Sequence, residues 1–246
     1  MKRFRHVLLL VLLFVLAFAA GRLYPVLRRP PLIPNQDAVV AGVDPSQVPV
    51  AYNPDLGGFI DIGPKDFDKL FIFYPGGLVR PQAYTWLGVA LAPLGVRTLI
   101  PVFPVDLAVT APNRADQLIS LAEGKPVVVG GHSLGGAMAA RYVLRHPDAA
   151  TGLVLMGAYS ADGDDLSALP LEVLVLAAEN DGLASVEEVR AGTPRLPETA
   201  KLKIIRGSVH GFFGRYGPQA GDGLPTVTRA AAERQIIGTL HKFFRE

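Results

Sequence analysis

The sequence predicts an α/β protein with a mostly parallel central sheet and helices on both of its faces. Short apolar runs that suit buried strands alternate with segments of helical spacing from about residue 70 onward. The chain has 246 residues, which suits one such domain and is too short for two. In residues 126–140, PVVVGGHSLGGAMAA, a valine run, a glycine-bounded turn and an alanine-rich segment follow one another, as a buried strand, a sharp turn and a helix do.

Residues 1–29 have the features of a targeting segment. Basic residues precede an uninterrupted apolar run over residues 7–20, which is the order of a secretory signal peptide, and Ala17-Phe18-Ala19 offers a cleavage site. The run is short for a helix that crosses a membrane, which needs about 20 apolar residues. Residues 23–27 could extend it if the side chain of Arg22 reaches back to the surface. We expect export, with retention as an N-terminal membrane anchor favoured over cleavage and secretion.

The remainder of the chain is expected to form a spacer over residues 30–47 and one domain over residues 48–246. The proline-rich start, PPLIP, favours an extended spacer. Strands are expected at residues 48–52, 58–62, 70–74, 96–102, 127–129, 152–156, 171–177 and 201–205, and the first two predict an antiparallel pair at a sheet edge. Helices are expected at residues 81–94, where Tyr84 would pack on the sheet, at 112–123, from Ser133 to about residue 146, and from Thr228 to the C-terminal end.

The turn at residues 131–135, GHSLG, carries the main chemical signal. It fits the G-x-S-x-G pattern, in which a strained turn from strand to helix lifts a serine hydroxyl above the sheet edge. Glycine at both ends lets strand and helix approach closely, because glycine has no Cβ. Ser133 is therefore the candidate nucleophile. The alternative is a glycine-rich turn with an incidental serine, and the flanking valine and alanine runs favour the nucleophile.

The GHSLGG form resembles that of lipases and esterases in the α/β-hydrolase superfamily. Further blocks, FYPGG at 73–77, PVDLA at 104–108, ENDG at 179–182 and HGFFGRYG at 210–217, resemble compact bacterial members related to dienelactone hydrolases. Dienelactone hydrolases proper use a cysteine nucleophile, so Ser133 sets this chain apart from that activity. The resemblance implies an α/β-hydrolase fold. It also implies an uncapped site, since only residues 157–170 lie where larger members insert a cap domain.

A serine hydroxyl needs a base, and the base needs a group that orients it. The resemblance implies the chain order serine, acid, histidine. Of the five histidines, only His210 lies in a late loop after a strand, so it is the candidate base. Asp181 follows a buried strand at the edge where sites of open α/β sheets gather, and it is the candidate acid. Glu179 is its nearest alternative, and Asp164 and Asp165 after the preceding strand are others.

Backbone amides are the candidates for holding an oxyanion. The resemblance implies the N–H of the residue after the nucleophile, Leu134, and a second N–H in the loop after the third strand. In that loop we expect Gly77, with Leu78 as the next candidate. Pro75 stands where the family has histidine, a departure of little effect because the donors are amides.

Composition excludes several other kinds of chemistry. The formal net charge is +2 with no long block of one sign, so nothing supports a nucleic-acid partner. The absence of cysteine excludes disulfides, thiolate zinc sites and a cysteine nucleophile. No H-E-x-x-H motif or histidine cluster indicates a metal, and we expect no cofactor.

Together these features predict a serine hydrolase that cleaves carboxylic esters or thioesters outside the cytoplasm through an acyl-enzyme. The expected partners are a small-molecule ester or thioester and, through the N-terminal segment, a membrane. Two alternatives stay open: a non-catalytic, membrane-tethered binding module, and an acyltransferase that uses the same three side chains. The glycine-rich residues 214–223 form a further trait, for which we predict only a wall near His210.

Overall fold

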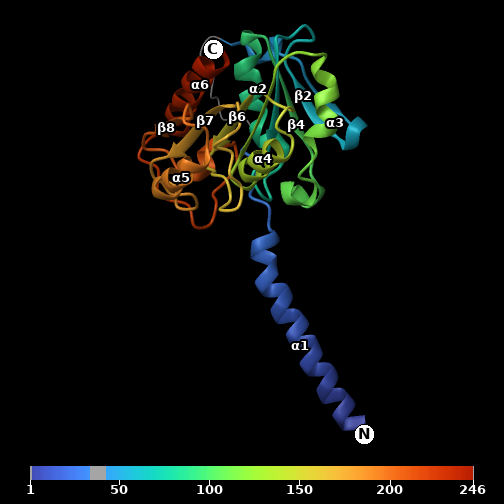
Figure 1. The fold of residues 1–246 in the computed structure, drawn as a ribbon. Coiled ribbons are helices and arrows are strands. Elements are labelled where there is room, and N and C mark those ends of the chain that lie inside the picture. The colour runs from blue at the N-terminus through green and yellow to red at the C-terminus, as the bar shows by residue number, and fades with distance from the viewer. Residues whose placement is uncertain (1, 34–42, 246) are drawn as a thin grey trace.

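A computed structural model of the chain describes residues 2–33 and 43–245. Its centre is one eight-stranded sheet in the order β1-β2-β4-β3-β5-β6-β7-β8 (Figure 1). Neighbouring strands from β4 to β8 run parallel, while β1 pairs with β2 and β2 with β4 in antiparallel fashion. The predicted fold class and the antiparallel pair at the edge are therefore confirmed.

The strands form where apolar runs can be buried on both faces. β5 and β6 are buried along their whole length, which is why their sequences show no polar alternation. The strands are β1 Val50–Asn53, β2 Phe59–Ile62, β3 Lys69–Tyr74, β4 Val96–Pro101, β5 Val127–His132, β6 Gly152–Met156, β7 Glu172–Ala178 and β8 Lys201–Ile205.

Helices cover both faces of the sheet and divide the core into two layers. One layer lies under α3 Ala115–Ile119, α4 Leu134–Arg145 and α5 Val186–Gly192. The other lies under α2 Thr85–Leu91 and α6 Arg229–Arg245. The sheet is thus enclosed between them, and its carboxyl edge is left to the loops.

Two predicted helices are shorter and more broken than expected. The segment 81–94 is a 3-10 turn, Pro81–Tyr84, then α2, then a second 3-10 turn, Ala92–Leu94. Pro93 disfavours a continuous helix there, and Gly95, with φ 70°, ends it. The segment 112–123 is α3 followed by the turn Ser120–Ala122. At α6 the expected Thr228 cap is present, with the Ala231 N–H 3.2 Å from Oγ1 of Thr228.

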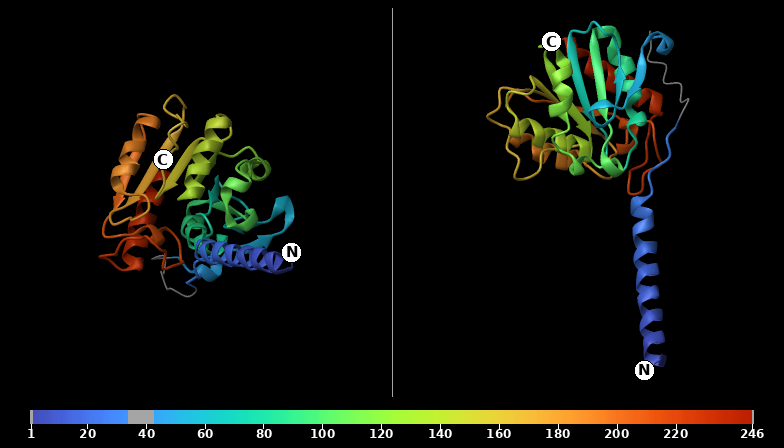
Figure 2. Two further views of the ribbon diagram at one scale, coloured as in Figure 1. Left: turned by 90° about the horizontal axis from the view of Figure 1, so that it is seen from below. Right: turned by 90° about the vertical axis from the view of Figure 1, so that its right-hand side faces the viewer.

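The N-terminal helix α1, Lys2–Leu27, extends away from the domain, as the right-hand view of Figure 2 shows. Every large apolar side chain from Val7 to Leu16 is at least 53% exposed. Among the residues that the structure describes, no helix is both long enough and apolar enough to cross a membrane.

The chain after α1 is attached to the domain. The Ile33 N–H donates to the Arg215 carbonyl at 3.0 Å, and the Gly217 N–H donates to the Pro31 carbonyl at 3.1 Å. Leu32 and Tyr216 form an antiparallel bridge between these two bonds. The described start of the expected spacer therefore lies along residues 215–217, and its residues 34–42 fall outside the described residues.

The carboxyl edge of the sheet is where the predicted site residues gather. The loops after β3, β5, β7 and β8 all leave the sheet there, and α1 leaves the domain from the same side (Figure 1). Residues 157–171, which connect β6 to β7, contain no helix or strand. No helix or strand of this connection therefore covers the edge.

Candidate active site

Ser133 occupies a strained turn between β5 and α4. Its backbone has φ 53° and ψ −125°, a conformation that costs energy for any residue with a side chain. Its N–H donates to the Met156 carbonyl at 3.0 Å, which ties the turn to β6. A Cβ atom at Gly135 would lie 2.2 Å from the Tyr74 and Pro75 carbonyl oxygens, so only glycine fits. The strained turn that the sequence predicts is therefore present, because the absence of a Cβ at Gly135 lets strand and helix backbones meet.

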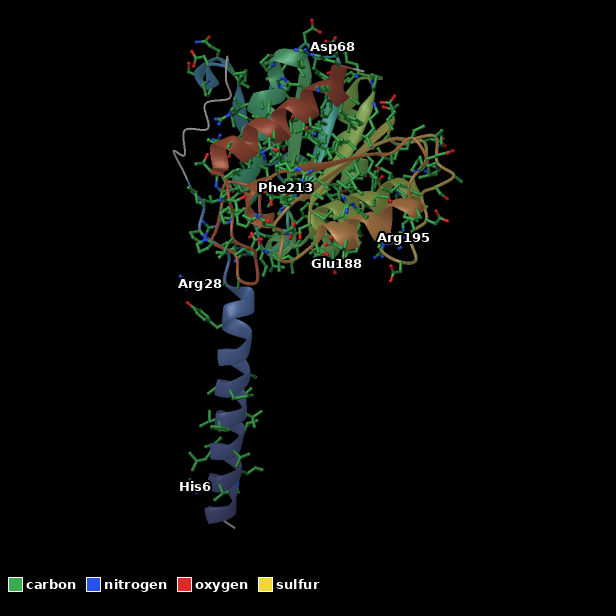
Figure 3. All side chains as sticks on the ribbon, turned by 90° about the vertical axis from the view of Figure 1, so that its left-hand side faces the viewer. His6, Arg28, Asp68, Glu188, Arg195 and Phe213 are labelled. Atoms are coloured by element: carbon green, nitrogen blue, oxygen red, sulfur yellow. The ribbon has the colours of Figure 1, made fainter. Side chains whose placement is uncertain are left out.

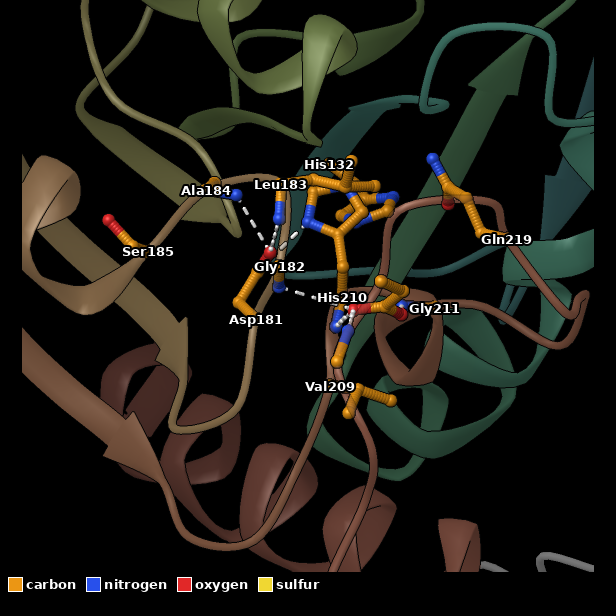
Figure 4. A network of polar contacts seen from close by, with 12 residues as sticks. His132, Asp181, Gly182, Leu183, Ala184, Ser185, Val209, His210, Gly211 and Gln219 are labelled. Carbon is orange, nitrogen blue, oxygen red and sulfur yellow. Dashed lines mark hydrogen bonds and ion pairs between the residues drawn. The ribbon is translucent and has the colours of Figure 1, made fainter.

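Asp181 and His210 meet across the loops that follow β7 and β8. Nδ1 of His210 lies 2.8 Å from Oδ2 of Asp181 (Figure 4). The other oxygen, Oδ1, accepts the N–H groups of Leu183 at 2.8 Å and Ala184 at 2.7 Å. Because the ionised carboxylate only accepts, the imidazole proton sits on Nδ1 and the lone pair is on Nε2. The pair therefore leaves a base at Nε2.

The alternative acids are engaged elsewhere. Glu179 accepts the Gly207 N–H at 2.8 Å, and this bond and Arg206 lower the pKa of its carboxyl. Asp164 pairs with Arg141 at 2.9 Å, and Asp165 accepts the Ser167 N–H at 2.9 Å. Of these four acids, Asp181 is the one that contacts the His210 ring.

The residue before Ser133 contacts His210, but within the described residues no hydrogen bond joins Ser133 itself to His210. In the described part of the chain, Nε2 of His210 is buried and has no partner. The ring of His132, the residue before the serine, lies 4.4 Å from the His210 ring between centroids. Gly157, which follows the Met156 carbonyl bound by Ser133, would place a Cβ 3.1 Å from Nδ1 of His210. In related chemistry the bond from nucleophile to base often tightens only when substrate is bound.

The two expected oxyanion donors lie next to each other. A Cβ on Gly77 would be 3.1 Å from Cδ2 of Leu134, so the loop after β3 contacts the start of α4. Within the described residues, neither the Gly77 N–H nor the Leu134 N–H donates a hydrogen bond. The Leu78 N–H, by contrast, donates to the Asp106 carbonyl at 2.8 Å. Gly77 is therefore the free donor of this loop.

Comparison with known proteins agrees with the fold. The sequence matches the alpha/beta hydrolase family over residues 70–234. The chain belongs to this family. A solved structure described as a predicted CIB-like hydrolase from Thermoplasma acidophilum is similar, with a TM-score of 0.64 and 13% identity over 81% of this chain and 100% of the other. At that identity the likeness shows the fold alone, and no curated protein matches.

For this α/β hydrolase, family membership supports an enzyme that hydrolyses a small-molecule substrate. Within the described ranges, no three acidic or histidine side chains gather where a metal ion could bind. Ser133, Asp181 and His210 remain the candidate catalytic side chains.

Tyr84 and His132 support the oxyanion side of this α/β hydrolase. The Tyr84 hydroxyl accepts the Gly76 N–H at 3.0 Å and lies 2.8 Å from Nδ1 of His132. Burial raises the pKa of Tyr84, and burial together with the nearby His210 lowers the pKa of His132 well below its usual value. Both are therefore neutral at neutral pH, and the hydroxyl proton is directed to Nδ1 of His132.

This role of Tyr84 was not expected from the sequence, which predicted only packing against the sheet. Its ring does pack there, 5.1 Å from that of Phe73, so the prediction was incomplete. The hydroxyl contact joins residues 8 and 48 positions apart, and no local pattern signals it.

Asp222 supports the acid–base side, and it was also missed. Its Oδ1 accepts the His210 N–H at 3.0 Å, and its Oδ2 accepts the Gly211 N–H at 2.7 Å. The Gly182 N–H lies 3.5 Å from Oδ1, beside the candidate acid. One carboxylate thus holds the loop of the base and the loop of the acid together.

The glycines around Asp222 explain the glycine-rich trait of residues 214–223. A Cβ on Gly223 would lie 1.9 Å from the Asn180 carbonyl oxygen, and one on Gly182 would lie 2.2 Å from that of Gly221. The loop at residues 221–223 packs backbone against backbone on the loop at residues 180–182. The predicted wall near His210 therefore also positions the loop that carries Asp181. An acidic residue between two glycines, GDG at 221–223, was the available signal.

Proposed function

We propose that the protein is a serine hydrolase that cleaves carboxylic esters or thioesters through an acyl-enzyme intermediate. The observation that carries the proposal is the contact of 2.8 Å between His210 and Asp181, and the His210 ring packs against His132, the residue before the strained Ser133. Oγ of Ser133 attacks the carbonyl carbon while Nε2 of His210 takes its proton. The same nitrogen returns the proton to the leaving alcohol or thiol, and Asp181 stabilises the imidazolium.

The free amides support the charge that develops on the carbonyl oxygen. The Gly77 and Leu134 N–H groups are the donors that this loop and this helix leave unused. A donor of this kind contributes about 3 kcal/mol to stabilising the transition state in comparable sites. Water, activated by His210, then attacks the acyl-enzyme and frees Ser133.

A fluorophosphonate probe tests the proposal, since it reacts only with an activated serine. We expect labelling of the wild type, loss of labelling in Ser133→Ala, and full labelling in the control Ser120→Ala, whose serine is exposed. A panel of p-nitrophenyl esters of graded chain length should then give turnover. Folded wild-type protein without labelling would support a binding module instead. Acyl transfer to an added alcohol in place of hydrolysis would support an acyltransferase.

We also propose that the protein acts outside the cytoplasm, held at a membrane by its N-terminal segment. The basic start, the apolar run at residues 7–20 and the exposure of those side chains along α1 support this location. A carbonate wash of membranes should leave the full-length protein in the pellet. A shortened form in the supernatant would show cleavage and secretion instead.

A further inference from the structure

A cavity of about 610 Å³ opens beside the candidate oxyanion donors. We call it the N-terminal cleft, because residues 28–31 and Tyr24 line one side of it. Gly77 and Leu78 line a second side, and residues 218–220 line the third. Its volume lies within the range of about 300–1,000 Å³ that is typical of small-molecule sites. The cleft reaches Gly77, so a molecule bound in it lies next to one of the two candidate oxyanion donors.

The N-terminal side of this cleft is built into the domain. The two hydrogen bonds and the bridge between residues 31–33 and 215–217 hold it to the loop that follows the base. On the other side, Arg29 forms an ion pair with Asp106, whose carbonyl accepts the Leu78 N–H. The segment after α1 is therefore linked both to the oxyanion side and to the acid–base side of the site.

The chemistry of the cleft is apolar and cationic. Arg28 is exposed where α1 meets the domain (Figure 3), and its side chain pairs with no acid among the described residues. No described acidic side chain lines the cleft, while Leu78 and three prolines supply apolar surface. A guanidinium without a partner next to apolar surface suits a ligand that carries an anionic group and a hydrocarbon part.

The surface around the site has the same character. On the oxyanion side Val105 is 58% exposed and Val109 is 51% exposed. On the acid–base side Leu183 is 40% exposed and Leu224 is 85% exposed. These side chains follow β4, β7 and β8 at the carboxyl edge, the side from which α1 leaves with its apolar side chains bare (Figure 3). Exposed apolar side chains flanked by arginine are typical of a surface that meets lipid.

We propose that the N-terminal cleft binds the anionic headgroup of a membrane lipid and places one of its ester carbonyls at Ser133. The proposal rests on the serine hydrolase function and names its substrate class. The Oγ–acyl bond forms as the bond from the acyl carbon to the glycerol oxygen breaks. The proton of Ser133 passes through His210 to that oxygen, so the leaving alcohol carries the headgroup out through the cleft. Water then releases the fatty acid.

The experiment compares the full-length protein on three substrates: vesicles of phosphatidylcholine and phosphatidylglycerol in equal parts, vesicles of phosphatidylcholine alone, and dissolved p-nitrophenyl butyrate. Fatty-acid release should be faster from the mixed vesicles, by about fivefold for each arginine that contacts the headgroup layer. Arg28→Gln should lower the rate on mixed vesicles relative to the rate on the dissolved ester by about fivefold. The control Arg145→Gln, at the C-terminal end of α4, should change neither rate.

Two outcomes overturn this proposal and leave the proposed function standing. One is equal release from both kinds of vesicle by a protein that turns over the dissolved ester. The other is hydrolysis of dissolved short-chain phosphatidylglycerol as fast as that of the vesicle lipid, because the membrane would then not be the source. If the wild-type protein neither hydrolyses the dissolved ester nor reacts with the fluorophosphonate probe, the hydrolase function itself is overturned.

Discussion

The two sides of the site use their hydrogen-bonding groups in opposite ways. On the acid–base side, both oxygens of Asp181 and both oxygens of Asp222 accept hydrogen bonds from His210 or from loop amides. On the oxyanion side, the amides of Gly77 and Leu134 are free within the described residues. Groups that fix geometry are thus satisfied by the protein, while groups that must receive a ligand are left open.

Burial follows the same division. His210 is 1% exposed and Asp181 is 8% exposed, so little water competes for their contact. Gly77, Leu78 and Ser133 are partly exposed, and the first two border the N-terminal cleft. The acid–base side fixes the tautomer of His210, and the oxyanion side is accessible to a substrate. The predictions that follow test whether this division governs activity and stability.

The largest effect is expected when the acid–base side loses the charge of the Asp181 carboxylate. Asp181→Asn removes the carboxylate that holds the proton on Nδ1 of His210, so kcat should fall about 10⁴-fold. Glu179→Gln is the matched control, because Glu179 bonds to Gly207 and not to His210. Ester hydrolysis measures both variants, and an equal loss in the two would refute the assignment of the acid.

The elbow joins the two sides, and its glycine is the next test. Gly135→Ala places a Cβ 2.2 Å from two carbonyl oxygens, so the free energy of unfolding should fall by about 3 kcal/mol. Gly238→Ala is the control, because nothing lies within 4 Å of its Cβ position in α6. That change should stabilise the helix by about 0.5–1 kcal/mol. Denaturant unfolding separates the two, and a stable Gly135→Ala protein would contradict the close approach.

Asp222→Asn tests whether the second carboxylate of the acid–base side positions His210. An amide has one accepting oxygen where the carboxylate has two, so the loop of the base should loosen. We expect a loss of about 2 kcal/mol in unfolding free energy, because bonds to a charged acceptor are the stronger ones. The ester kcat should fall about tenfold if about two-thirds of that energy positions His210. Unchanged kcat with lowered stability would limit Asp222 to a structural role.

The smallest effect concerns pH and His132, which lies between the two sides. Burial lowers the pKa of His132 in the folded protein. Below a pH of about 6.5, His132 is therefore protonated in the unfolded chain but stays neutral in the folded chain. The unfolded state binds more protons there, so this group makes unfolding easier as pH falls, by about 1.4 kcal/mol per pH unit. His132→Gln should lose that contribution to the slope. Denaturant titrations at several pH values measure it, and identical slopes would contradict a neutral His132.

The fold could be predicted well because its strands are buried on both faces. The three valines of β5 are one apolar run that only a covered strand accommodates, and the same holds for β6. The turn at residues 131–135 was recognisable because the close approach of strand and helix requires glycine at both of its ends, within five consecutive residues. Local sequence was less reliable at 81–94, where Pro93 divides a segment whose spacing suggested one helix.

The acid and its supports were harder to predict, because long-range contacts decide them. Four acidic residues followed suitable strands, and the sequence left them as alternatives to one another. Only the folded arrangement shows that Asp181 contacts His210, 29 positions away. Asp222 acts through backbone amides, which any residue supplies. Tyr84 binds one amide and the side chain of His132, 48 positions away, so no local motif names either contact.

The bare connection from β6 to β7 has a further consequence for redesign. Residues 157–171 cross the open edge without a helix or strand, and a Cβ on Gly163 would meet nothing within 4 Å. A helical hairpin grafted at this tip would lie beside α4, where Asp164 pairs with Arg141, and would disturb no strand pairing. This connection is therefore a position where new structure can be grafted to change selectivity, while Ser133, Asp181 and His210 keep their places.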